Sequence, residues 1–240
     1  VTAGFRQEDY SIYGGQTTGT VFARQDLVDG VALFGRYAES FAVPTGNDLW
    51  GWGGNVNLMP EEVKSWEVGF RFGKDGSTRG SVSYFSSKYE NLIEFWDPDG
   101  DWIGIMKNID KAETEGLELS LVWNLTKVWQ VRSGYTYLDA RKEDGSRLAR
   151  RPRHTSSVAI DYKGEKEIGG AEVLLVSDRM DFGFAKGEDY VVARLYGSYE
   201  LSSFLSLFGR VENLFDEEYE EVDGYPTLGV GAFGGLRYSF

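Results

Sequence analysis

The sequence contains no cysteine and a single histidine, His154. Without cysteine the chain can form neither a disulfide framework nor a thiolate metal site, and it offers no cysteine nucleophile. One imidazole is too few for a zinc site built from several histidines. No stretch approaches the roughly 18 consecutive apolar residues that a membrane-spanning helix needs. The sequence therefore excludes proteins held together by disulfides, proteins with thiolate metal sites and membrane proteins that span the bilayer with helices.

Positive charge is also scarce. The chain has 25 Lys and Arg residues against 38 Asp and Glu residues, which gives a net charge of −13. Proteins that bind nucleic acid present a basic patch, so we expect no nucleic-acid partner. A hydrolase would need a nucleophile and a base. His154 with Thr155 and Ser156 offers no convincing arrangement, and we predict no catalytic residue and no enzymatic activity.

What the chain has in abundance favours β-structure. Aromatic residues make up 15% of the chain, with 31 glycines and only 5 prolines. Apolar residues recur with a period of two, and no comparable helical stripe is present. The last segment shows the alternation clearly, with one face formed by Val230, Ala232, Gly234, Leu236, Tyr238 and Phe240.

Short and long connections alternate along the sequence. Turn-forming residues mark short links at 26–30, 74–77, 124–127, 163–166 and 200–203. Longer links are expected at 9–16, 39–62, 89–111, 138–153, 177–189 and 216–228. The pattern predicts an all-β fold of about 12 strands, a transmembrane antiparallel up-and-down β-barrel with short periplasmic turns and long extracellular loops.

The chemistry of the two strand faces distinguishes a membrane barrel from a soluble β-sandwich. A sandwich buries its apolar face, whereas a membrane barrel turns that face to lipid and its polar face inward. Aromatic residues gather at strand ends, as in an interfacial girdle. They are Trp123, Trp129, Tyr162, Tyr199, Tyr238 and Phe240. We therefore favour the barrel, with a soluble sandwich as the rival interpretation.

Several segments then resemble one family, the TonB-dependent outer-membrane receptors of the vitamin B12 (cobalamin) and siderophore type. The longest is GRVENLFDEEYEEVDGYPTLGVGAFGGLRYSF at 209–240, and NVNLMPEEVKSWEVGF at 55–70 is another. The other segments that carry the resemblance lie at 3–19, 36–45, 108–121 and 135–154. The resemblance implies a multi-pass barrel in the bacterial outer membrane that takes up cobalamin or iron–siderophore ligands.

The resemblance also implies a barrel of about 22 strands that encloses an N-terminal plug domain. No segment of residues 1–240 resembles the plug, so TonB contact would run through a domain outside this sequence. We predict one domain, residues 1–240, which is either the C-terminal part of a receptor barrel or a smaller barrel that closes on itself. Open edges in lipid are costly, so an unclosed chain would self-associate. The alternative function is a free-standing passive pore or structural scaffold.

Four tryptophans lie in the long links, at Trp50, Trp52, Trp96 and Trp102. Exposed aromatics on loops often mark a binding surface, so we predict ligand contact, with loop-on-loop packing as the alternative.

The acidic segment WDPDGDW places Asp97, Asp99 and Asp101 at alternate positions, as a Ca²⁺ loop does. It lacks the bidentate glutamate of such loops, so we favour a solvated turn. We predict no cofactor and no metal site, and leave Ca²⁺ in surface loops as an option.

The C-terminal residues Leu236, Tyr238 and Phe240 resemble the signal that the barrel-assembly machinery reads, through strand addition at an edge. The alternative is an ordinary last strand.

A basic run is formed by Arg147, Arg150, Arg151 and Arg153. Guanidinium groups suit anionic oxygens, so one interpretation is contact with lipopolysaccharide phosphates. The other is a solvated cluster balanced by Asp139, Glu143 and Asp144. His154 is interpreted as structural.

Charged residues on the polar faces are expected to pair across strands or to line a lumen. They are Arg71, Arg132, Arg194, Arg210, Arg237, Glu67, Glu118, Glu172, Glu200 and Glu212.

Overall fold

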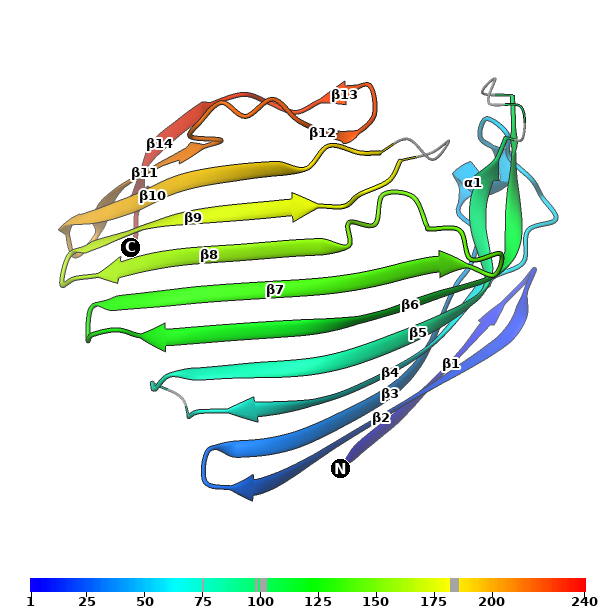
Figure 1. Ribbon diagram of the computed structural model, residues 1–240, viewed down its shortest axis with the longest axis horizontal. Helices are drawn as coiled ribbons and strands as arrows, with labels where there is room; N and C mark the ends of the chain where they lie inside the picture. The colour runs from blue at the N-terminus through cyan, green and yellow to red at the C-terminus, as the bar shows by residue number, and fades with distance from the viewer. Residues whose placement is uncertain (75, 98, 100–102, 182–185) are drawn as a thin grey trace. The chain divides into compact units, whose positions relative to one another are not determined.

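The computed structural model describes residues 1–240 apart from 75, 98, 100–102 and 182–185, and for residue 110 it describes only the backbone. Twelve strands form one antiparallel sheet in which each strand neighbours the next along the chain (Figure 1). The strands are β1 (Thr2–Tyr10), β2 (Gly14–Val28), β3 (Val31–Ala42), β4 (Glu61–Phe72), β5 (Arg79–Trp96), β6 (Ile105–Asn124), β7 (Trp129–Lys142), β8 (His154–Lys163), β9 (Glu167–Ser177), β10 (Tyr190–Ser202), β11 (Leu205–Glu212) and β14 (Gly231–Tyr238). The predicted all-β, up-and-down order of about 12 strands is confirmed.

Three short elements lie outside this sheet. They are the helix α1 (Gly46–Trp50) and a two-stranded hairpin of β12 (Glu220–Val222) and β13 (Tyr225–Pro226), within the link from β11 to β14. Within the described residues, no helix combines the length and the apolar character needed to cross a membrane.

The chain divides into two compact units, which are described separately. The first unit comprises Val1–Phe70, Ser83–Gly116 and Asp139–Leu148. The second comprises Arg71–Val82, Leu117–Leu138 and Ala149–Phe240. In the first unit, β1 and β2 pair without a bulge from Thr2↔Phe22 to Tyr10↔Gly14. In the second, antiparallel pairing joins β7 through β11 to β14, with a register shift in β10 between Glu200 and Ser202.

Some of the expected links are shorter than the sequence suggested. Residues 9–16 were expected to form a long loop, but β1 and β2 are joined by a turn of only three residues, 11–13. Gly14 adopts a φ of +69°, which glycine accepts without strain, so a glycine pair that reads as a loop instead closes a hairpin. Similarly, β5 and β6 extend into the expected loop 89–111 and leave only 97–104 between them.

The helix α1 was also not expected, because no apolar stripe with helical spacing precedes it. Its start is fixed by a capping box instead: the Thr45 hydroxyl accepts from the Asp48 amide, and the Asp48 carboxylate accepts from the Thr45 amide at 2.8 Å. This local signal, rather than periodicity, explains a helix of one turn.

The apolar side of the sheet is exposed. On β4, the alternate residues Trp66, Val68, Phe70 and Phe72 are each 43–48% exposed. Buried apolar residues are few among those described, and none is a large side chain that is fully buried. A soluble sandwich would bury these alternate residues, so the arrangement is that of a membrane barrel wall. We call this side the apolar face.

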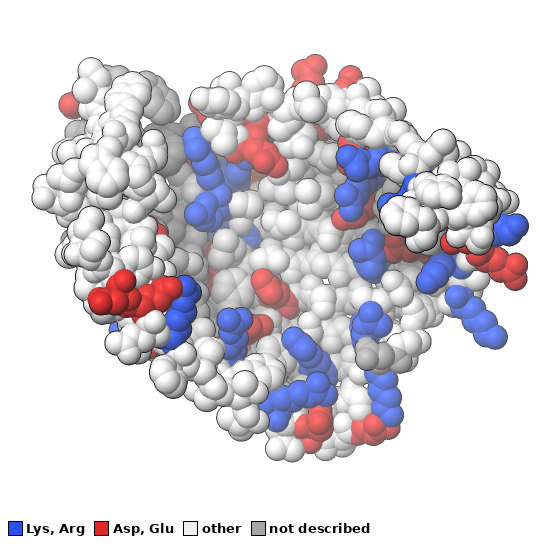
Figure 2. Space-filling view, turned by 180° about the vertical axis from the view of Figure 1, so that it is seen from behind, with Lys and Arg blue, Asp and Glu red and all other residues white. Residues whose placement is uncertain are grey.

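The opposite side, which we call the polar face, carries cross-strand ion pairs. In the second unit Arg132 pairs with Asp161 at 2.6 Å, and Arg194 pairs with Glu172 at 2.6 Å. Asp161 also accepts from the Tyr196 hydroxyl. The pairing predicted for polar-face charges is therefore present at Arg132 and Arg194. Figure 2 shows basic and acidic side chains interspersed rather than separated by sign.

Candidate ligand-contact loops and membrane-facing surface

Aromatic side chains bound the apolar face at both ends of the strands. In the second unit, Trp129 packs against Tyr162 near the short turns, with ring centroids 4.9 Å apart. Eight residues further along β7, Tyr137 lies 5.5 Å from the His154 ring. Eight residues span about 26 Å along a strand, or about 20 Å across a bilayer at the usual tilt. This is close to the apolar band of an outer-membrane barrel.

Within each unit, tyrosines mark the edge of the apolar face on the side of the long loops. Each lies on the apolar face, and its hydroxyl bonds to a polar group one step nearer the loops. Tyr37 donates to Glu39 at 2.9 Å, Tyr84 donates to Glu115 at 2.5 Å, and Tyr135 bonds His154 Nδ1 at 2.8 Å. Such rings, with one apolar and one wet side, are typical of the membrane–water interface.

His154 sits among aromatic rings. Its ring stacks on Tyr135 and lies beside Tyr137. Its only hydrogen-bonding side chain among those described is the Tyr135 hydroxyl, so the structural interpretation of His154 fits its surroundings.

Of the predicted ligand-contact tryptophans, Trp50 and Trp52 are strongly exposed, at 70% and 73%. They lie at and just after the C-terminus of α1. Trp96, at the end of β5, is about half exposed and carries the Lys107 ammonium 5.2 Å from its ring centroid. Trp102 lies outside the described residues.

The link that carries Trp50 and Trp52 is firmly held. The Asn55 side-chain amide donates to the Met106 carbonyl at 3.0 Å, and the Met106 amide donates to Gly53 at 2.6 Å. Asn108 closes the far end of the link, because it bonds both the amide and the carbonyl of Met59 and also donates to Asn91. Sequence reasoning missed both asparagines, since each contacts residues about 50 positions away.

In the second unit, three links are joined by charged residues. Arg179, which is 95% buried, donates to the carbonyls of Glu220 and Glu221. Asp181, equally buried, pairs with Arg150 at 2.9 Å and accepts from the Asp223 amide. These contacts attach the β12–β13 hairpin and the link 143–153 to the link 178–189. Neither Arg179 nor Asp181 was singled out in the sequence, because nothing local distinguishes a buried loop charge from a solvated one.

The basic run is partly engaged in this network. Arg150 pairs with Asp181 and Arg153 pairs with Asp178, both at 2.9 Å, while Arg151 is exposed. Asp139 pairs with Arg141, Glu143 pairs with Lys111, and Asp144 accepts from Ser146. A cluster balanced by these three acidic residues stays the alternative interpretation. Contact of Arg147, Arg150, Arg151 and Arg153 with lipopolysaccharide stays a prediction.

In the acidic segment, Asp97 and Asp99 are described and Asp101 is not. Among the described side chains, no group of three or more histidine, cysteine or carboxylate residues is arranged to hold a metal ion.

The C-terminal strand presents its alternate residues outward. Leu236 and Tyr238 are largely exposed, as is Phe240, and Tyr238 packs edge-on against Phe204 at 5.6 Å. The Ser239 amide donates to the Phe204 carbonyl, so pairing with the β10–β11 turn continues to the end of the chain. Their role as an assembly signal stays a prediction.

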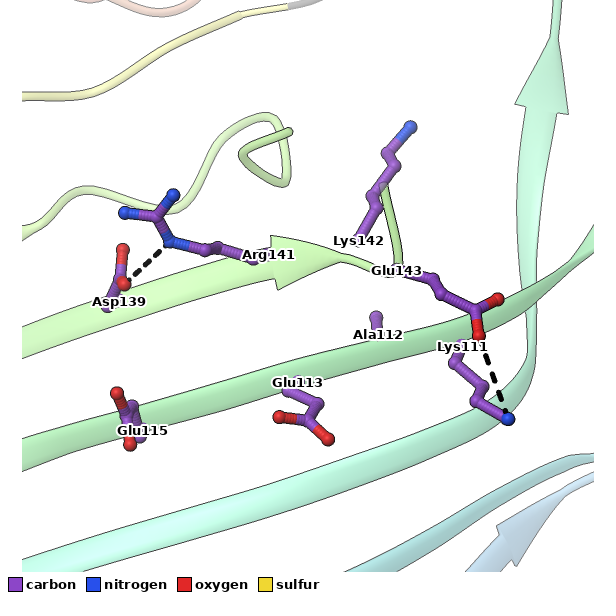
Figure 3. Close-up of a pocket in the computed structure, with 8 residues that line it drawn as sticks. All are labelled: Lys111, Ala112, Glu113, Glu115, Asp139, Arg141, Lys142 and Glu143. Atoms are coloured by element: carbon purple, nitrogen blue, oxygen red, sulfur yellow. Dashed lines mark hydrogen bonds and ion pairs between the residues drawn. The ribbon is translucent and has the colours of Figure 1, made fainter. Parts of the chain in front are cut away.

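A hollow of about 470 Å³ in the first unit is lined almost entirely by charged residues (Figure 3). Lys111 pairs across it with Glu143 at 3.7 Å, and Arg141 pairs with Asp139 at 2.7 Å. The remaining lining residues are Ala112, Glu113, Glu115 and Lys142. Its carboxylates and cations alternate, so it offers no site for a purely anionic or purely cationic ligand.

Comparisons with known proteins agree with this architecture. A family model described as TonB dependent receptor-like, beta-barrel, matches residues 1–214. The chain is 33% identical, over 99% of its length, to the vitamin B12 transporter BtuB of Vibrio vulnificus, and 28% identical, over 98%, to that of Photobacterium profundum. It spans 40% of the length of each of these relatives.

Solved structures give the same fold. The copper transporter OprC superposes on 94% of this chain with a TM-score of 0.81, at 19% identity and over 40% of its own chain. A ferric enterobactin receptor, PfeA, of Pseudomonas aeruginosa, in a mutant form bound to enterobactin, superposes on 99% with a TM-score of 0.80, at 25% identity and over 43% of its own chain.

Proposed function

Because the chain belongs to the TonB-dependent receptor-like β-barrel family, a family of bacterial outer-membrane proteins, we propose that it forms barrel wall and extracellular loops of a receptor for uptake of a cobalamin or iron–siderophore ligand. The identity to two vitamin B12 transporters supports this proposal. Energy coupling through TonB would be carried by a plug domain and not by these residues. The chain itself would carry out no catalysis.

The observation that carries the ligand-binding role is the exposed tryptophan pair on an anchored link. Trp50 and Trp52 expose most of their surface, although the link around them is bonded to β6 through Asn55 and Asn108. A large aromatic surface held in a fixed position loses little entropy when it covers a ligand. Trp96 lies at the end of the neighbouring strand β5, and we include it in the same contact surface.

The C-terminal residues Leu236, Tyr238 and Phe240 would serve assembly rather than transport. Their alternating outward side chains suit recognition by strand addition. In this proposal, the barrel-assembly machinery is a partner only while the protein is being inserted.

The test is equilibrium binding of cyanocobalamin and, separately, of a ferric siderophore to the intact receptor in detergent. We expect W50A/W52A to weaken binding of the true ligand by about tenfold or more. W66F on the apolar face is the control and should bind normally.

Unchanged affinity in W50A/W52A would remove the tryptophans from the contact surface. A protein that binds neither ligand class but conducts ions in planar bilayers would instead be a passive pore, and the uptake proposal would be wrong.

A further inference from the structure

The apolar face changes character abruptly above its aromatic edge in the first unit. Trp66 and Tyr84 mark this edge, with ring centroids 5.2 Å apart. The Tyr84 hydroxyl points to Glu115 on the next strand, which places Glu115 just beyond the edge on the same face. On β6, Lys111, Glu113 and Glu115 are exposed while the intervening Ala112 and Thr114 are buried. The charged residues therefore continue the lipid-facing side of the strand.

Together with neighbouring strands these residues form what we call the outer collar. It consists of Lys88, Lys111, Glu113, Glu115, Asp139, Arg141 and Glu143. From Glu115 to Lys111 it extends about 13 Å along β6. It contains the hollow shown in Figure 3.

Two ion pairs of the outer collar are loose, whereas Arg141 holds Asp139 more closely, at 2.7 Å. Lys88 and Glu113 lie 3.1 Å apart and Lys111 and Glu143 lie 3.7 Å apart, and all four side chains are largely exposed. Exposed pairs of this kind contribute little to stability, so they exchange readily for other partners. Both the ammonium and the carboxylate groups can therefore reach a ligand on this surface.

We propose that the outer collar binds the phosphorylated glycolipid head groups of the outer leaflet, with Lys111 and Arg141 contacting phosphates and Glu113 and Glu115 contacting the divalent cations that accompany them. Position supports this partner, because the collar faces lipid and lies beyond the acyl-chain band on the side of the long loops. Charge supports it too, since only a ligand that carries both signs complements alternating cations and carboxylates.

The height of the collar distinguishes this partner from an ordinary phospholipid. A phosphoethanolamine head also carries both signs, but it is compact and would meet only the lowest row, at Glu115. A head of phosphorylated sugars with bound cations extends far enough to meet Lys111 as well. The proposal rests on the outer-membrane location and not on which nutrient the receptor takes up.

The experiment measures binding of purified lipopolysaccharide to the intact receptor in detergent, with Mg²⁺ or with a chelator. We expect K111E/R141E to lower affinity about tenfold in both conditions, because two charge-assisted contacts to phosphate are lost. E113Q/E115Q should lower affinity only when Mg²⁺ is present. R194Q on the polar face is the control and should bind normally.

Two further probes keep the outcome decisive. Enzymatically dephosphorylated lipopolysaccharide should bind weakly and equally to all variants, and phosphatidylethanolamine vesicles should not distinguish them. Unchanged affinity in K111E/R141E, or an equal loss with phosphatidylethanolamine, would overturn the proposal. Cyanocobalamin or siderophore binding and the thermal unfolding midpoint, measured on the same samples, should not change, which separates this test from that of uptake.

Discussion

The two units order their loops by opposite means. In the first, neutral asparagine amides attach the link 43–60 to β6, and two tryptophans remain exposed on it. In the second, buried charges at Arg179 and Asp181 tie three links together. Burying a charge is costly unless the charge is paired or hydrogen-bonded, so the contacts of such a group fix a scaffold, whereas an exposed aromatic on an anchored link is free to meet a ligand.

The largest effect is expected where the buried charge is removed. Arg179→Ala should leave two carbonyls of the β12–β13 hairpin without their donor, at a cost of about 3 kcal/mol, or about a hundredfold faster amide exchange over 219–225. Hydrogen exchange with mass spectrometry measures this. Arg151→Ala, at an exposed position, is the control, and equal exchange in both variants would mean that the Asp181–Asp223 hydrogen bond and the Tyr190–Tyr219 stack hold the hairpin without Arg179.

A smaller effect is expected for the amide anchor. Asn108→Ala removes two hydrogen bonds between β6 and the link, at Met59, and a third between β6 and β5, at Asn91, which should cost about 1–2 kcal/mol and loosen the link. Exchange over 46–59 should accelerate roughly tenfold, while 219–225 stays unchanged. Asn57→Ala in the same link is the matched control. Acceleration in both regions would show that the two loop systems are not independent.

The exposed tryptophans should contribute almost nothing to stability. W50A/W52A should shift the free energy of unfolding by less than about 0.5 kcal/mol, because both side chains are already largely exposed. Chemical denaturation of the detergent-solubilised receptor checks this. If the free energy of unfolding falls by several kcal/mol, the tryptophans pack structurally, as Arg179 does, and the contrast between the two units is lost.

The smallest effect concerns the turn between β7 and β8. The Ser146 hydroxyl and amide both donate to Asp144 and lower the pKa of its carboxyl. A depressed pKa means that the carboxylate supports the turn at neutral pH and that this support is lost as the pH falls through the folded pKa. Ser146→Ala should raise the Asp144 pKa toward its ordinary value, as followed by carboxyl-carbon NMR. An unchanged pKa would assign the shift to the backbone hydrogen bonds and the nearby Lys142 charge.

The sheet could be predicted from the sequence because each strand is two-faced. Alternation at Trp66, Val68 and Phe70 specifies which side meets lipid, and it needs no knowledge of distant residues. The lengths of the turns were harder to predict from the sequence, because Gly14 and Gly15 suit a loop as well as a tight hairpin.

The loop contacts could not be predicted because their partners are far apart in the sequence. Asn108 meets Met59, and Arg179 meets Glu220, across more than 40 residues. No local pattern separates these residues from solvated polar ones. The exposed tryptophans could be singled out by composition and position alone, but what anchors them could not.

The central claim is that the apolar face of this sheet meets acyl chains. These 240 residues contain no cysteine, so single nitroxide labels at Leu119→Cys and at Glu118→Cys report on the two faces in a bilayer-reconstituted receptor. We predict that the label at 119 is accessible to oxygen dissolved in lipid and shielded from a water-soluble nickel complex. The label at 118 should not show this lipid-facing pattern of accessibility. Equal access of the nickel complex to both labels, or the reverse pattern, would contradict it.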